Sequence, residues 1–256
     1  MNLVFVGFYF LLALKQGIGL KTVKDIPEQF IAEFEGGHKQ KRSVVTGTVL
    51  TASEIKVAVD KHNEYRRIVV PSASNMLEMV WDPELGKMAQ DYSRTCTYAH
   101  SSGRRTSNFT WVGENLYLRS NEWSATKVLE DAITGWDNEK KVYTYSSKAC
   151  SRVCGHYTQT AWAESYAVGC GVTTCSNVTV GSKVWSTAQI VVCNYGPGGN
   201  IKGKHPYISG SPCSACPKGY GCKNGLCSLS ADSNMLKGLT SFMLTATVFA
   251  MLYTTV

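Results

Sequence analysis

Apolar side chains recur at helical spacing in three stretches of the chain, and the first two stretches begin with a helix N-terminal signal. The first signal is Thr51-Ala52-Ser53-Glu54, a capping box in which hydroxyl and carboxylate accept from unpaired backbone N–H groups. The second is Asp82-Pro83-Glu84, with Asp as the N-cap and Pro in the first turn. The third helix is predicted from Ser124 to about Trp136. The buried faces are expected to comprise Ile55, Ala58, Val59 and His62; then Leu85, Met88, Ala89, Tyr92 and Cys96; then Val128, Leu129, Ala132, Ile133 and Trp136.

The second half of the chain changes to strand patterns. Residues 166–172 and 185–195 are rich in Val, Ile and aromatic side chains, which is typical of buried strands. Helices followed by strands predict an α+β fold with helices packed on both faces of a sheet.

The cysteines and the N-terminus indicate an oxidising compartment. Residues 1–14 carry no charge, and Gly17 and Gly19 offer a cleavage site, so residues 1–19 are interpreted as a signal peptide. The chain has 10 cysteines, an even number that predicts disulfides rather than a zinc site, because no second metal-spaced pair accompanies Cys213 and Cys216. The net charge of +7 comes without a stripe of Lys and Arg, so no nucleic-acid partner is expected.

Two further segments flank the predicted domain. Residues 20–50 contain the basic cluster 39–42 and are interpreted either as a propeptide cut after Arg42 or as a linker. Residues 239–256 carry no charge and follow a small, polar spacer, so 229–256 is predicted to be exchanged for a GPI anchor near Ser230. A transmembrane helix is the alternative, and release from cells by phosphatidylinositol-specific phospholipase distinguishes the two.

Two sequons predict glycans on an extracellular glycoprotein. Asn108 begins Asn-Phe-Thr and Asn177 begins Asn-Val-Thr, both in polar stretches that are interpreted as loops.

Three segments together resemble one known family. They are Gly-His-Tyr-Thr-Gln-Thr-Ala-Trp at 155–162, Cys-Asn-Tyr-Gly-Pro-Gly-Gly-Asn at 193–200, and a segment at 211–227 with four cysteines. The chain resembles the CAP superfamily of cysteine-rich secretory, antigen-five and pathogenesis-related-one proteins, and within it the glioma-pathogenesis-related and peptidase-inhibitor branches. The resemblance implies a three-layer α-β-α sandwich at 51–205 and a short disulfide-rich hinge at 206–228.

The resemblance also implies a metal-binding cleft. His100, Glu114, Glu139 and His156 stand at the motif positions where two His and two Glu converge in the family, and such side chains suit zinc or another divalent cation. The expected function is a non-enzymatic module, secreted or on the cell surface, that binds an extracellular protein or a sterol or other lipid. The alternative is a metal-dependent hydrolase or protease using His100 and His156. Neither a His-Glu-x-x-His helix nor a Gly-x-Ser-x-Gly elbow is present in the sequence.

The remaining implications concern disulfides and lipid. By resemblance, Cys96 pairs with Cys175, Cys170 with Cys193, Cys213 with Cys222 and Cys216 with Cys227, which leaves Cys150 with Cys154. The family's lipid-binding loop corresponds here to residues 141–147, where Tyr143 and Tyr145 are the candidate contacts.

Overall fold

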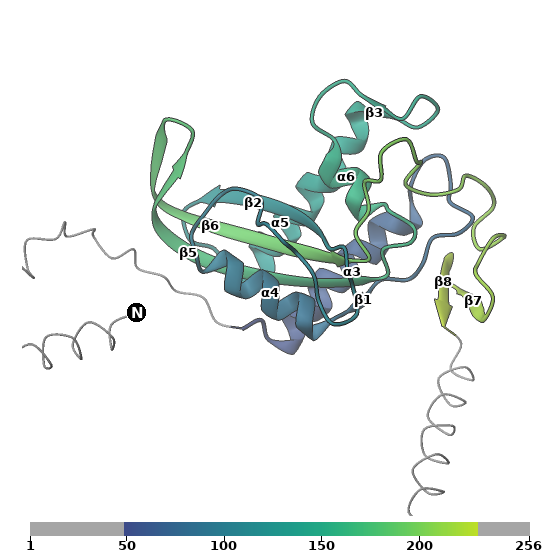
Figure 1. Cartoon of the computed structure of the whole chain (residues 1–256), viewed down its shortest axis with the longest axis horizontal. Helices are drawn as coiled ribbons and strands as arrows, with labels where there is room; N and C mark the ends of the chain where they lie inside the picture. Colours follow the sequence, from purple (N-terminus) through teal and green to yellow (C-terminus); the bar gives the residue numbers. More distant parts are fainter. Residues whose placement is uncertain (1–48, 230–256) are drawn as a thin grey trace, which may run out of the picture. The chain divides into compact units, whose positions relative to one another are not determined.

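The computed structural model describes residues 49–229, which form three layers around a four-stranded sheet (Figure 1). The strand order is β1-β5-β6-β2, in which β1 is parallel to β5 and the other neighbours are antiparallel. The strands are β1 (Val80–Trp81), β2 (Gly113–Ser120), β5 (Ala167–Val180) and β6 (Lys183–Gly196). The α+β sandwich expected from the sequence is confirmed.

Helices cover both faces of this sheet. Helix α4 (Pro83–Ser93) packs on one face, and α3 (Ala52–Arg67) and α5 (Ala125–Asn138) lie on the other (Figure 1). The two predicted caps are present, because Thr51 and Asp82 each accept a backbone N–H of the first turn, and Ser124 also caps α5 in this way. Cys96 was placed on the second helix, but that helix ends at Ser93.

The sheet is larger than the sequence indicated. Strand β2 was missed, although it pairs with β6 along all eight of its residues and carries Glu114. Strand β5 continues to Val180, so Asn177 lies on a strand and not in a loop. Strand β1 also comes from the first half of the chain, so the sheet draws on both halves.

Alternation along β5 divides its side chains between the two helical layers. Val168, Cys170 and Val172 belong to the core beneath α3 and α5. On the opposite face, a Cβ atom on Gly169 would lie 2.0 Å from the backbone N of Gly86 in α4, so only glycine allows this close packing.

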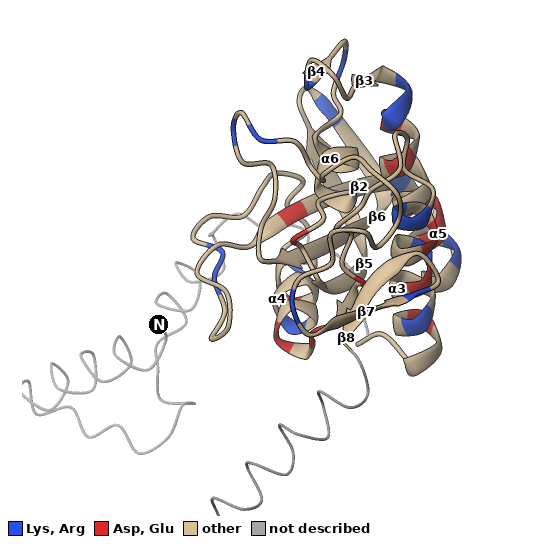
Figure 2. Ribbon diagram, turned by 90° about the vertical axis from the view of Figure 1, so that its right-hand side faces the viewer, with Lys and Arg blue, Asp and Glu red and all other residues tan. Residues whose placement is uncertain are grey.

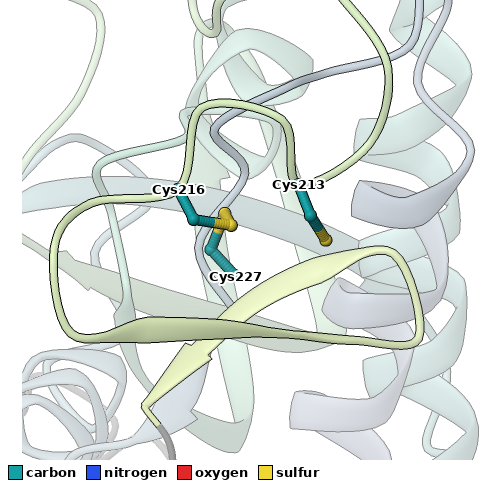
Figure 3. A group of neighbouring side chains, drawn as sticks. All are labelled: Cys213, Cys216 and Cys227. Atoms are coloured by element: carbon teal, nitrogen blue, oxygen red, sulfur yellow. A yellow bond between two sulfur atoms is a disulfide. The ribbon is translucent and has the colours of Figure 1, made fainter.

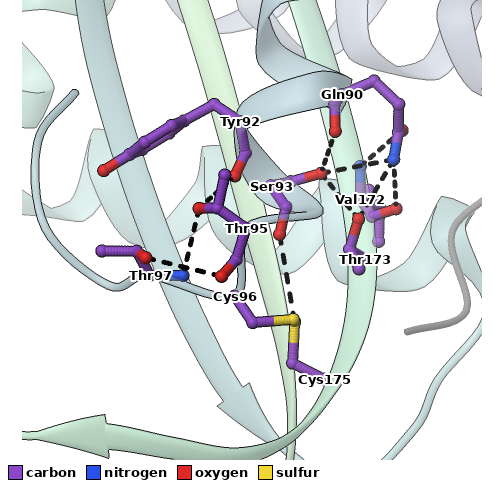
Figure 4. Close-up of a disulfide and its surroundings, with 9 residues drawn as sticks. All are labelled: Gln90, Tyr92, Ser93, Thr95, Cys96, Thr97, Val172, Thr173 and Cys175. Atoms are coloured by element: carbon purple, nitrogen blue, oxygen red, sulfur yellow. Dashed lines mark hydrogen bonds between the residues drawn. A yellow bond between two sulfur atoms is a disulfide. The ribbon is translucent and has the colours of Figure 1, made fainter. Parts of the chain in front are cut away.

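The close approach of α4 also lets one side chain complete the free edge of β5. Figure 4 shows Gln90 beside Val172, where Gln90 Nε2 donates to the Val172 carbonyl (3.2 Å) and Gln90 Oε1 accepts from the Val172 N–H (3.2 Å). Ser93 and Thr173 add a hydroxyl–hydroxyl bond of 2.7 Å next to the Cys96–Cys175 disulfide (Figure 4). The backbone edge of β5 at Val172 is thus hydrogen-bonded to the Gln90 side chain rather than left unpaired.

All ten cysteines form disulfides; four pairs are those that the resemblance implied, and the fifth joins the two cysteines that remained. They are Cys96–Cys175, Cys150–Cys154, Cys170–Cys193, Cys213–Cys222 and Cys216–Cys227.

The cysteine-rich segment at 206–229 is docked on the domain. It forms a two-stranded sheet of β7 (Tyr220–Lys223) and β8 (Leu226–Leu229). Cys227 donates its N–H to the Met76 carbonyl (2.8 Å) and accepts from the Glu78 N–H (2.8 Å), while Leu226 is fully buried. Since both backbone bonds and a buried side chain hold it, this segment is part of the folded unit.

A buried arginine connects three parts of the fold. The Arg66 guanidinium, on the last turn of α3, donates to the carbonyls of Leu77 (2.7 and 3.1 Å), Thr160 (2.8 Å), Trp162 (2.8 Å) and Ala163 (3.2 Å). It forms no ion pair with a carboxylate of the described residues. Burial lowers the pKa of Arg66 to about 9, which leaves it protonated at neutral pH. The side chain therefore fixes the polypeptide that follows α6 (Gly155–Thr160), the helix that begins the first of the three motifs.

Several predictions from the sequence concern the rest of the chain. The signal peptide, the propeptide or linker before residue 49, and the spacer and tail after residue 229, with Ser230, lie outside the described residues and stay predictions. Within 49–229, every helix is too short or too polar to cross a bilayer.

Replacing Arg66 by Met should lower the free energy of unfolding by about 3 kcal/mol or more, because four buried carbonyls lose their donor. Arg66→Lys should recover only part of this loss, since an ammonium cannot span the same set of carbonyls. The exposed neighbour gives a matched control, and Arg67→Met should change stability by less than about 0.5 kcal/mol. Guanidinium unfolding followed by tryptophan fluorescence measures all three, and equal effects of Arg66→Met and Arg67→Met would contradict the assignment.

Candidate functional site

The first half of the predicted cleft is a histidine held by a buried carboxylate. His100 Nδ1 donates to Glu114 Oε1 (2.8 Å); the His100 side chain is 58% exposed, whereas that of Glu114 is 0% exposed. Glu114, on β2, also accepts from the Ser101 N–H (3.0 Å) and the Ser101 hydroxyl (2.6 Å), and Arg104 Nη1 lies 3.5 Å away. The Ser101 hydroxyl is thus bonded to Glu114, and the carboxylate orients the imidazole.

The second half repeats this arrangement on different elements. His156, in the first turn of α6, donates from Nδ1 to Glu139 Oε1 (2.6 Å). Glu139, at the end of α5 in the short 3₁₀-helix η2 (Glu139–Val142), also accepts the backbone N–H groups of His156 (3.0 Å) and Tyr157 (3.2 Å). The His156 ring stacks on Trp136 with 16° between the planes. Glu139 therefore caps α6 and fixes the imidazole at the same time.

A buried hydrogen-bond chain ties α6 to α3. Burial lowers the pKa of His62 to about 4, so its ring is neutral, and its Nδ1 donates to the Ala58 carbonyl (2.7 Å). The other nitrogen, Nε2, must then accept, and its partner is the Tyr195 hydroxyl at 2.9 Å. Asn115 Nδ2 donates both to the Tyr195 oxygen (3.2 Å) and to the His156 carbonyl (3.1 Å). The chain from α3 thus ends on the backbone of a site residue.

The two family motifs interlock through their side chains. Gln159 of the first motif accepts from the Gly199 N–H (2.9 Å) of the second. Asn200 accepts from the Thr158 hydroxyl (2.7 Å) and donates to the Gly155 carbonyl (2.9 Å). These bonds explain why both segments occur together: each completes the hydrogen bonding of the other.

The geometry leaves the same atom available on both histidines. In each ring Nδ1 is bonded to a carboxylate, and Nε2 forms no hydrogen bond within residues 49–229. A carboxylate at Nδ1 orients a histidine for metal binding through Nε2, so these residues fit a divalent cation. In the described part of the chain, no three ligand atoms of His100, Glu114, Glu139 and His156 lie within 4.8 Å of one another. If an ion is bound here, the two imidazoles would hold it through Nε2, and each glutamate would orient one ring.

One cluster of three potential ligands does occur, but its chemistry differs. Figure 3 shows the sulfur atoms of Cys213, Cys216 and Cys227 close together, all within 4.8 Å. All three belong to disulfides, Cys213–Cys222 and Cys216–Cys227, so none is a thiolate that binds metal.

The proposed lipid-loop tyrosines pack against the domain. Tyr143 lies on β3 (Tyr143–Thr144), which pairs with β4 (Ala149–Cys150), and its ring contacts Tyr157. The Tyr145 hydroxyl donates to the Tyr207 carbonyl (2.7 Å), and its ring stacks on His205. Neither ring is free, so lipid binding by these side chains stays a prediction.

Both glycosylation candidates are accessible. Asn108 is exposed in the loop before β2, and Asn177 is exposed near the end of the β5–β6 hairpin. Use of these sequons stays a prediction.

Comparison with known proteins identifies a family model and relatives that match this chain. A model of the cysteine-rich secretory protein family, CAP, matches residues 59–195. Human peptidase inhibitor 16 is 42% identical over 188 residues, which cover 71% of this chain but only 38% of that protein. Human GLIPR1-like protein 1 is 41% identical over 174 residues, covering 66% of this chain and 69% of that protein.

A solved structure shares the fold. The crystal structure of NaASP2 with Zn²⁺ has 28% identity and a TM-score of 0.58, covering 71% of this chain and 98% of that one. Together with the family match and the interlocked motifs, this likeness shows that the chain belongs to the CAP, or cysteine-rich secretory protein, family.

Proposed function

We propose that this protein is a non-enzymatic extracellular binding module whose cleft holds one divalent cation through His100 and His156. The observation that carries this proposal is the hydrogen bonding of the two glutamates. Glu114 accepts from His100 and twice from Ser101, and Glu139 accepts from His156 and from the Tyr157 N–H.

This hydrogen bonding favours a role for Glu114 and Glu139 in orienting the histidines over a role as catalytic bases. A hydrolase built on a bound metal needs a general base positioned to take a proton from the attacking water. Here the carboxylate oxygens already accept hydrogen bonds from imidazoles, backbone N–H groups or a hydroxyl. A bound ion would supply charge and fixed coordination, while the glutamates keep the two rings oriented.

The similar proteins support the proposal of a non-enzymatic module that holds a metal ion. NaASP2 was crystallised with Zn²⁺, and peptidase inhibitor 16 is named for inhibition rather than for catalysis. We propose a protein partner, and the inhibitor name favours a peptidase. The five disulfides agree with a protein that acts outside the cell.

The alternative function, a metal-dependent hydrolase, would give peptide cleavage that stops when a chelator removes the metal. Purified protein incubated with a mixed peptide library should give no cleavage, either with zinc or after removal of metal with a chelator. Turnover that disappears on chelation and also in the His100→Ala/His156→Ala variant would overturn the non-enzymatic assignment.

Zinc titration tests the cleft itself. Wild-type protein should bind one Zn²⁺, and the affinity should fall in acid because a protonated imidazole cannot bind metal. His100→Ala/His156→Ala should abolish detectable binding. Glu139→Gln should weaken it about 10- to 100-fold, since the support of one ring is lost.

The matched control is His205→Ala, which removes a histidine that stacks on Tyr145 and is not one of the two His–Glu pairs. It should bind zinc as the wild type does. Isothermal titration calorimetry measures the affinities, and circular dichroism verifies that each variant is folded. Equal zinc binding by wild type and the folded double variant would rule out the site.

A further inference from the structure

The exposed basic side chains of this protein are not distributed evenly. Residues 140–154 contain four Lys or Arg and no Asp or Glu, and no Asp or Glu occurs from residue 165 to residue 231. The helices carry most of the acidic side chains. Figure 2 shows Lys and Arg around β3 and β4, whereas Asp and Glu occur together with Lys and Arg along α4 and α5.

Three contacts join two of these basic segments into one surface. The Ser151 N–H donates to the Val142 carbonyl (2.9 Å), which closes the β3–β4 hairpin and the Cys150–Cys154 loop on each other. Tyr145 of the hairpin stacks on His205, with 4.5 Å between ring centroids. Asn200 donates to the Gly155 carbonyl, immediately after the disulfide loop. The hairpin, the disulfide loop and the 200–205 loop are therefore in direct contact.

The basic side chains on this surface are available for a partner. Exposed Lys or Arg residues stand at five positions on it, and we call them the basic surface: Lys141, Lys148, Arg152, Lys202 and Lys204. None of the five forms an ion pair within residues 49–229.

Acidic groups near this surface are few. Glu139 is bonded to His156, and Lys140 is bonded to Asp137. Glu164 lines a cavity of about 530 Å³ together with Lys204 and Tyr145, and it is the acidic side chain of that cavity. The surface thus keeps an excess of positive charge.

On the helices, by contrast, exposed lysines have acidic partners. Lys56 pairs with Asp60 on α3, and Lys87 pairs with Asp91 on α4. Pairs of this kind cancel locally, whereas the five side chains of the basic surface have no such partner among residues 49–229.

We propose that the basic surface binds a sulfated polysaccharide chain. Sulfate groups stay ionised at every physiological pH, and a chain of them matches several Lys and Arg side chains spread over two loops. The neighbouring cavity of about 530 Å³ is lined by residues 203–209 and by Tyr145 of the hairpin, so aromatic side chains that suit a sugar ring lie beside Lys204 and the carboxylate of Glu164. The sulfate groups would bind the exposed Lys and Arg side chains around this cavity. This interaction goes beyond the proposed function.

Binding of a heparin octasaccharide to the full disulfide-bonded protein tests the proposal. In 0.15 M NaCl, Lys148→Gln/Arg152→Gln should weaken binding about tenfold, as expected for loss of two charge contacts of about 0.7 kcal/mol each. The control Lys56→Gln/Lys87→Gln removes the same number of charges from the helices and should change the dissociation constant less than about twofold. Raising the salt to 0.5 M should weaken wild-type binding strongly.

Two other ligands, desulfated heparin and a DNA duplex, test whether the basic surface recognises sulfate groups on a polysaccharide. Desulfated heparin of the same length should bind much more weakly than heparin, and so should a DNA duplex of equal charge. Equal loss in both double variants, or wild-type binding that does not depend on sulfation, would overturn the proposal. Tighter binding of the duplex would instead assign the surface to nucleic acid and would equally overturn it. Thermal unfolding of each variant establishes that all four substitutions leave the domain folded.

Discussion

One buried guanidinium holds together the parts from which this domain and its cleft are built. Arg66 binds carbonyls from the Leu77 segment and from the residues after α6, and its charge has no carboxylate partner in the described structure. The charge is stabilised by oriented backbone dipoles instead. Because Met76 and Glu78 also pair with Cys227, the same clamp extends to the docked cysteine-rich segment. The position of α6, and hence of His156, depends on this contact.

Hydrogen bonds fix the two histidines of the candidate site in place. Each glutamate serves one histidine and adjacent backbone or hydroxyl donors, so the two rings are oriented before any ligand arrives. The Ala58–His62–Tyr195–Asn115 chain adds a second support on the interior side of α6. Such an arrangement leaves the Nε2 atoms without a hydrogen-bond partner in residues 49–229 while it occupies the carboxylates, and this supports the proposed binding role.

Local sequence signals predicted the three long helices, because helix caps and the spacing of apolar side chains are local properties of the chain. The caps at Thr51 and Asp82 follow from the residue types at each helix start, and the buried faces follow from the spacing of apolar side chains. The site residues came from the family motifs, since separations such as that between His100 and His156 carry no spatial information. Strand β2 escaped notice because its alternation of Glu, Asn, Leu, Tyr and Arg is only partly apolar, and pairing with β6 decides its conformation.

The buried Arg66 and the basic surface could not be predicted from the sequence, because each depends on residues that only the fold brings together. Arg66 belongs to a residue type that is rarely buried, and only the fold brings carbonyls from residues 77 and 160–163 around it. The sequence has no Lys and Arg stripe, so it predicted no nucleic-acid partner and gave no sign of a basic surface. However, the tertiary structure brings Lys148 and Arg152 beside the loop that carries Lys202 and Lys204.

The imidazoles of His100 and His156 are fixed through Nδ1 and leave Nε2 available. Nitrogen-15 NMR of these rings in metal-free protein, above neutral pH, measures which nitrogen carries the proton. We expect a proton on Nδ1 and none on Nε2 for both rings, and a shift of the Nε2 resonances when Zn²⁺ is added. A proton on Nε2 of either ring, or Zn²⁺-induced shifts confined to Nδ1, would contradict this expectation.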